Sequence, residues 1–125
     1  MDIQARDGEL WVAENARHRV IRYDRDGKEL ASFGKRDRTA SNGFGGCCEP
    51  KNLRFGPDGD IYCSQSESPT VVKRFTPKGE FRGVVTLADF KCGCARVTVE
   101  LSQDRREVYV LDPMTDTIRK FVARQ

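Results

Sequence analysis

The chain has 125 residues, of which 38% are hydrophobic and 33% are charged, so it can form one domain with a real core and is not a disordered segment. The formal net charge of +3 is mild and does not by itself indicate a nucleic-acid partner, because such a partner needs the excess charge on one face. No apolar run approaches the roughly 20 residues of a membrane span, and the first residues lack the basic and apolar regions of a signal peptide, which leaves the compartment open.

Short apolar segments follow one another along the chain. Each combines aromatic and β-branched residues, and turn sequences such as RDG, PDG and TPKG separate them. No segment carries the long apolar stripe of an amphipathic helix. The predicted strands cover residues 2–6, 10–13, 19–23, 30–33, 52–55, 61–64, 71–75, 81–85, 96–101, 108–112 and 117–121.

Three segments, 7–34, 58–85 and 105–121, repeat one another, and their alignment places residues of one kind in shared columns. Runs that are apolar on both faces suit strands covered on both sides, as in stacked propeller blades. The columns are aromatic (Trp11, Tyr62, Tyr109), basic (Arg22, Arg74, Lys120) and apolar (Leu10, Ile61, Val108; Val12, Cys63, Val110; Val20, Val72, Ile118; Tyr23, Phe75, Phe121).

The first repeat resembles an NHL repeat, the blade of a family of β-propellers. The residues that carry this resemblance are Gly8, Val12, Glu14, Asn15, Arg19, Val20, Tyr23, Asp26 and Gly27. The resemblance implies an all-β fold of four-stranded antiparallel blades, with boundaries at about 1–46, 47–91 and 92–125 and the last strand of the third blade missing.

About three blades are too few for a ring, since a closed propeller has about 4–8. We therefore expect half or a fragment of a roughly six-bladed ring. Either the natural chain is longer, or a protein partner or self-association closes the propeller.

The blade map places four of the five cysteines in the two connections between blades, beside the channel mouth. They are Cys47, Cys48, Cys92 and Cys94. Three interpretations stay open: a disulfide between the connections, which would suit an exported protein, a zinc or iron–sulfur site, or small side chains that fill gaps. Neither pair has C-x-x-C spacing, so no cofactor is expected unless these cysteines bind a metal. The fifth, Cys63, is expected in the core.

The connection from Gly34 to Pro50 is long and locally basic, and long ordered loops are often binding loops. We expect His18 to be a solvated turn residue, with a charged-ligand contact beside Arg17 and Arg19 as the alternative. The candidate residues for an anionic small ligand or a partner are Arg17, His18, Lys35, Arg36, Arg38 and Asn42.

The sequence favours a non-enzymatic binding or assembly module whose ligand or partner binds at the channel mouth. Its single histidine has no partner carboxylate fixed by sequence, and the column of Glu14, Gln65 and Asp112 is expected to make turn contacts. Alternatives are a cysteine-dependent redox or metal-binding propeller and, less favoured, RNA binding by the basic column. We expect that column on the solvated side of the outer strands instead.

Overall fold

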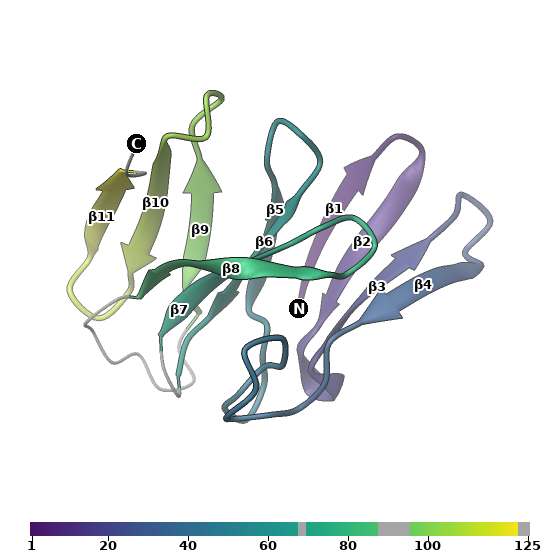
Figure 1. Cartoon of the computed structure of the whole chain (residues 1–125), viewed down its shortest axis with the longest axis horizontal. Helices are drawn as coiled ribbons and strands as arrows, with labels where there is room; N and C mark the ends of the chain where they lie inside the picture. The colour runs from purple at the N-terminus through teal and green to yellow at the C-terminus, as the bar shows by residue number, and fades with distance from the viewer. Residues whose placement is uncertain (68–69, 88–95, 123–125) are drawn as a thin grey trace.

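The structure is a computed structural model, and it describes residues 1–67, 70–87 and 96–122 (Figure 1). Within these ranges the chain forms eleven strands in three antiparallel sheets, together with one turn of 3-10 helix, η1 (Asn15–Arg17). The all-β class predicted from the sequence is therefore confirmed. None of the helical structure in these ranges has the length and apolar character needed to cross a membrane.

Each sheet is a simple meander of strands that follow one another in sequence, and we call the sheets blades one, two and three. Blade one contains β1 (Asp2–Arg6), β2 (Glu9–Glu14), β3 (Arg19–Tyr23) and β4 (Glu29–Phe33). Blade two contains β5 (Asn52–Phe55), β6 (Ile61–Gln65), β7 (Val71–Phe75) and β8 (Phe81–Leu87). Blade three contains, in its described part, β9 (Thr98–Leu101), β10 (Glu107–Asp112) and β11 (Thr117–Val122).

The turns form where the sequence supplies residues that accept a positive φ. Gly27 (φ 82°) closes the β3–β4 turn by donating its N–H to Asp24 O at 3.2 Å. Gly79 (φ 87°) does the same between β7 and β8, with Thr76 O as the acceptor at 2.9 Å. Glycine adopts this conformation without a Cβ clash, so these positions end one strand and start the next.

The three blades lie side by side, with their first strands β1, β5 and β9 next to one another (Figure 1). Strand β5 contacts both β1 and β9, so blade two lies between the other two. This position explains the burial pattern, since every residue of β6 is buried whereas β1 alternates and β11 is mostly exposed. Because neighbouring blades bury both faces of blade two, its strands contain continuous apolar runs.

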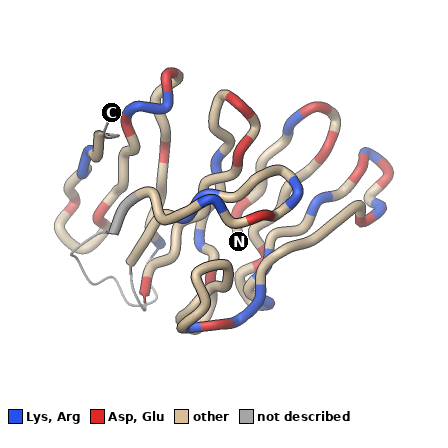
Figure 2. The backbone as a smooth tube through the Cα atoms, in the orientation of Figure 1, with Lys and Arg blue, Asp and Glu red and all other residues tan. Residues whose placement is uncertain are grey.

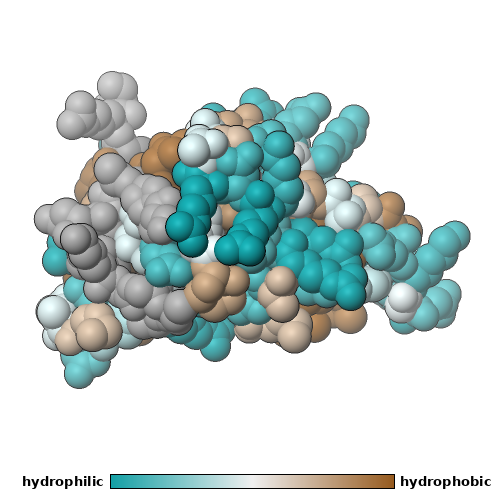
Figure 3. Space-filling view, turned by 90° about the horizontal axis from the view of Figure 1, so that it is seen from below, coloured by the Kyte–Doolittle hydropathy of each residue, from teal (hydrophilic) through white to brown (hydrophobic). Residues whose placement is uncertain are grey.

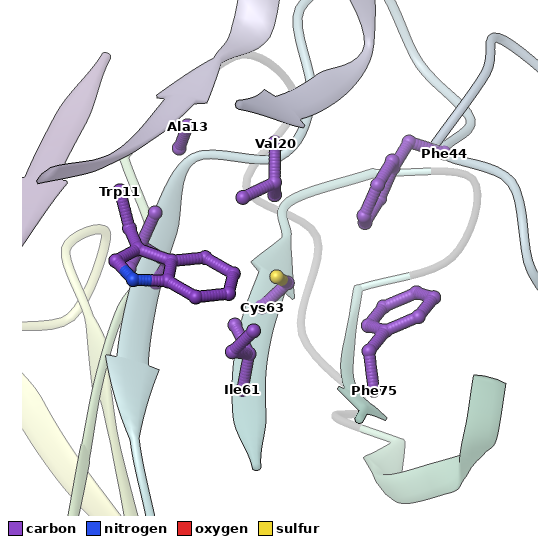
Figure 4. Packing of buried hydrophobic residues seen from close by; sticks show 8 residues of the cluster. Trp11, Ala13, Val20, Phe44, Ile61, Cys63 and Phe75 are labelled. Atoms are coloured by element: carbon purple, nitrogen blue, oxygen red, sulfur yellow. The ribbon is translucent and has the colours of Figure 1, made fainter. Parts of the chain in front are cut away.

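Two apolar clusters join the blades. The cluster between blades one and two includes Trp11, Val20, Cys63 and Phe75 (Figure 4). The ring centroid of Phe75 lies 5.0 Å from that of Phe33 and 5.6 Å from that of Phe44. The cluster between blades two and three is formed by Tyr62, Val72, Val97, Val99, Val108 and Val110. Cys63 lies in the first cluster, as the sequence predicts, and burial raises the pKa of its thiol far above the ordinary value.

Side chains at the start of the first strands also hold the blades together. Asp2 Oδ2 of β1 accepts hydrogen bonds from the Leu53 N–H at 3.0 Å, from Arg54 and from the Asn52 amide. Asn52 Oδ1 of β5 then accepts the N–H of Val99, in β9, at 2.9 Å. Each first-strand acceptor thus satisfies a backbone N–H of the next blade, which would otherwise be costly to bury.

We expect Asn52→Ala to lower the free energy of unfolding by about 2 kcal/mol, because it leaves the buried Val99 N–H and the Asp2 carboxylate without this partner. Denaturant titration checks this, with the exposed Asn42→Ala as the matched control, for which we expect a change within about 0.5 kcal/mol. Equal stabilities for the two variants would show that the blades do not depend on this bond.

Candidate functional site

The connection between blades one and two, residues 34–51, lies against the β2–β3 turn at the lower edge of Figure 1. It begins at Gly34, where a Cβ would lie only 2.9 Å from His18 O and 2.7 Å from the Phe44 ring, so only glycine fits. Phe44 is fully buried and anchors the connection in the core. Asp37 accepts the N–H groups of Thr39 and Ala40, both at 2.9 Å, and these bonds lower the pKa of its carboxyl to about 2.

Polar side chains of neighbouring elements fix the backbone of the connection. Three of them, from His18, Gln65 and Lys73, are buried, and burial lowers the pKa of the Lys73 ammonium. Together with Phe44, these side chains attach the loop to blades one and two. The contacts are Lys73 Nζ to Gly43 O, Gly45 N to Gln65 Oε1 at 3.0 Å, Cys47 N to Glu67 Oε1 at 3.0 Å, and a contact of 3.3 Å between His18 Nε2 and Gly46 O.

The predicted binding residues lie on this edge, with one correction. Lys35, Arg36, Arg38 and Asn42 are exposed on the connection, and Arg17 is exposed on the adjoining η1 turn. Two of these cations have acidic neighbours, since Lys35 lies 3.8 Å from Asp37 and Arg17 lies 3.7 Å from Glu14.

His18 is the correction, because it is only 5% exposed instead of being a solvated turn residue. It adopts a left-handed conformation (φ 56°) that ends η1, and the connection folds over it with Gly46 O against its ring. The burial of His18 could not be predicted from the local sequence, because the residues that cover it lie almost thirty positions further along the chain. His18 is therefore packed beneath the loop and contacts its backbone.

A buried glutamate in the same connection was not predicted. Glu49 is fully buried, and its Oε1 accepts hydrogen bonds from the Ser66 N–H at 3.0 Å and from the Ser66 hydroxyl. Its Oε2 has no hydrogen-bond partner among the described residues. Burial raises the pKa of this carboxyl to about 7, against the opposing influence of Ser66 and Lys51. In the sequence, an acidic residue before a proline in a loop gives no sign of burial.

The cysteines of this connection lie close to each other and to a lysine. The sulfurs of Cys47 and Cys48 are 3.1 Å apart, and Lys51 Nζ lies 2.8 Å from the Cys48 sulfur. Burial acts to lower the pKa of Lys51, but the Cys48 contact and the nearby Glu49 carboxyl raise it on balance.

The predicted counterparts of these cysteines, Cys92 and Cys94, lie outside the described residues, so a link between the two connections stays a prediction. Within residues 1–67, 70–87 and 96–122, no group of three or more His, Cys, Asp or Glu side chains is arranged to hold a metal ion.

The acidic column makes the turn contacts that were expected of it. Glu14 accepts a hydrogen bond from Arg19 Nε at 2.6 Å, and Asp112 Oδ1 accepts the Met114 N–H at 2.9 Å. Gln65, the third member, holds the connection through Gly45. These side chains fix local structure at the ends of their strands.

The basic column lies on the third strand of each blade, where Arg22 and Arg74 are half-buried against aromatic rings and Lys120 is exposed. Arg22 lies 5.2 Å from the centroid of the Trp11 ring and donates to Glu9 at 3.1 Å. Arg74 is placed in the same way over Tyr62 with Asp60, and Lys120 pairs with Glu107 at 3.4 Å. In the described residues, basic and acidic positions are interspersed over all three blades (Figure 2).

Comparison with known proteins supports the fold and leaves the family open. No protein-family model and no curated protein matches the chain. The solved structure of streptogramin B lyase, a β-propeller protein, is similar with a TM-score of 0.55 and 14% identity over 97% of this chain and 39% of that chain. A protein of unknown function from Bacteroides caccae is similar with a TM-score of 0.57 and 12% identity over 98% of this chain and 46% of that one.

The fold therefore belongs to the β-propeller class, with three blade-like sheets in the described residues. The chain spans less than half the length of either of these structures. The assignment to the NHL family stays a prediction.

The burial of Glu49 predicts a pH dependence of stability. The folded state holds this proton more tightly than the unfolded chain, so the contribution to stability is complete below pH 4.5 and is lost as pH rises through about 7. We expect the free energy of unfolding of the wild type to fall relative to that of Glu49→Gln by up to roughly 3 kcal/mol across this window.

Denaturant titrations from pH 4 to pH 8 measure this difference, with the exposed Glu29→Gln as the matched control that keeps the wild-type slope. Parallel curves for wild type and Glu49→Gln would mean that the carboxyl is ionised in the folded state at no cost.

Proposed function

We propose that this chain is a non-enzymatic binding module of the β-propeller type, which takes an anionic ligand or partner at the edge formed by the connection 34–51. The observation that carries the proposal is a loop whose backbone is fixed by buried side chains while its cations point outward. A fixed loop loses little conformational entropy on binding, so its charges are available for affinity. Propeller folds serve many functions, and the assignment therefore rests on this site.

The charge of the edge favours an anion. Lys35, Arg36 and Arg38 lie within four residues of one another, and only Asp37 opposes them there. Arg17 adds a fourth exposed cation from the adjoining turn. Viewed from below, the described surface is largely hydrophilic, which suits a polar ligand better than an apolar one (Figure 3).

The roles of the titratable groups favour binding over catalysis. The single histidine faces a backbone carbonyl, and Glu14 and Asp112 hold turns. Glu49 has a carboxyl that titrates near neutral pH, but it is enclosed by the connection and by Ser66. General acid–base chemistry needs a group within reach of a substrate, and these groups are engaged inside the fold.

We expect Arg36→Ala/Arg38→Ala to weaken binding of inorganic tripolyphosphate roughly tenfold or more, measured by isothermal titration calorimetry at low salt. Arg36→Lys/Arg38→Lys keeps the charge and should retain part of the affinity. The matched control is Arg25→Ala/Lys28→Ala, which removes two exposed cations from the β3–β4 turn. A control that weakens binding equally, or a wild type that binds no tripolyphosphate, would contradict a site on the connection.

A second candidate function depends on the cysteines. The 3.1 Å separation of the Cys47 and Cys48 sulfurs and the ammonium of Lys51 beside Cys48 favour thiolate chemistry, in redox cycling or in binding of zinc or an iron–sulfur cluster. A metal site predicts stoichiometric zinc or iron that Cys47→Ser/Cys48→Ser abolishes, measured by elemental analysis of anaerobically purified protein. Peptide mapping without reductant identifies a disulfide instead, and a metal-free protein with reduced cysteines contradicts both versions.

A further inference from the structure

The two junctions between blades follow one rule. We call the face with the aromatic column (Trp11, Tyr62, Tyr109) the leading face of a blade, and the face with the column Leu10, Ile61, Val108 the trailing face. At the first junction, the leading residues Trp11 and Val20 pack with the trailing residues Ile61 and Cys63. At the second junction, Tyr62 and Val72 pack with Val108 and Val110. Each leading face therefore covers the trailing face of the next blade.

The trailing face of blade one has no blade against it in the described structure. On β1 and β2 it carries Ile3 and Leu10, which are 57% and 40% exposed, whereas Ile21 of β3 on the same face is buried. The strand registers pair Ile3 with Val12, Leu53 with Cys63 and Val99 with Val110, so these three first-strand residues occupy equivalent positions. Leu53 and Val99 are fully buried at the internal junctions. Blade one thus exposes an apolar surface that its counterparts bury.

The leading face of blade three is open in the same way. It carries Tyr109, Leu111 and Ile118, and Ile118 is 71% exposed. By register, Ile118 is equivalent to Val20 and Val72, each of which is 1% exposed at its junction. The pair of Glu107 and Lys120 beside Tyr109 repeats the pair of Glu9 and Arg22 beside Trp11. The exposed leading face thus has the composition of the buried ones.

The hydrogen bonds between first strands also continue to both open faces. Asp2 accepts the N–H of Leu53, and Asn52 accepts the N–H of Val99. The position equivalent to Asp2 and Asn52 in β9 is Thr98, whose hydroxyl oxygen can accept a hydrogen bond. The N–H that would donate this bond belongs to Ile3, and in this structure it donates to the side chain of the preceding residue, Asp2, at 2.9 Å.

We propose that two copies of this chain associate head to tail, with the leading face of blade three of each copy covering the trailing face of blade one of the other. Thr98 of one copy then accepts the N–H of Ile3 of the other. Two copies supply six blades, within the range of about 4–8 for closed propellers, whereas three copies would exceed it. The ring has a two-fold axis along its channel and two identical junctions, which gives a closed assembly.

A second copy supplies both kinds of face that the two open faces need. Both open faces carry residues of the columns that form the internal junctions. The open face of blade one is a trailing face, and the open face of blade three is a leading face. An unrelated partner would have to imitate a blade, and a head-to-head pair would place two faces of the same kind together. The proposal is independent of the ligand site, because none of the residues on the connection takes part.

The test is the molar mass of the chain in solution, measured by light scattering during size-exclusion chromatography. We expect the wild type at twice 14.2 kDa. Ile118→Glu and Ile3→Lys each place charges in both junctions and should weaken association by roughly 100-fold or more, giving monomers. Both side chains are exposed within one copy, so the variants should fold, as circular dichroism and Trp11 fluorescence can show.

The control is Met114→Glu, which changes an exposed apolar residue in the β10–β11 turn, away from both open faces, and should remain a dimer. A mixture of Ile118→Glu and Ile3→Lys should form dimers again, because one junction then contains both opposite charges and the other is wild type. A wild type that stays monomeric at its highest soluble concentration, a larger assembly, or a mixture that stays monomeric would each overturn the head-to-tail ring.

Discussion

The whole structure depends on the need to cover both faces of each sheet. Blade two is covered on both faces, because β6 is buried along its full length between blades one and three. The aromatic rings around Phe75 and the aliphatic cluster around Val110 provide that cover, and burial of this kind is the dominant favourable contribution to folding. Blades one and three are covered on one face each, which explains the alternating burial of β1 and the exposure of β11.

The candidate binding edge is a consequence of the same packing. The connection 34–51 starts at the outer strand of blade one, places Phe44 in the core between the blades, and returns to the first strand of blade two. Along that path its backbone meets buried polar groups of blade two, namely Gln65 and Lys73, which satisfy its amide and carbonyl groups. One side of the loop thus fills the junction between the blades, and the charged side chains Lys35, Arg36 and Arg38 are exposed.

Much of the fold could be predicted because the signals are local or periodic. The β-branched runs between glycine turns gave strands within two residues of those observed, and the shared columns gave the order of the blades. The site was harder to predict because its geometry depends on contacts between distant residues. His18 is buried by Gly46, and Glu49 by Ser66, and no short-range pattern announces either contact.

The core thiol gives the molecule an internal reporter of its own opening. Cys63 lies between Val20 and Ile61 at the junction of blades one and two, and burial keeps it protonated and away from solvent (Figure 4). A thiol in this state reacts with an alkylating reagent only when the two blades separate, since thiolate and access are both required. The rate of modification at Cys63 therefore measures how often this junction opens, separately from fraying at the edge strands.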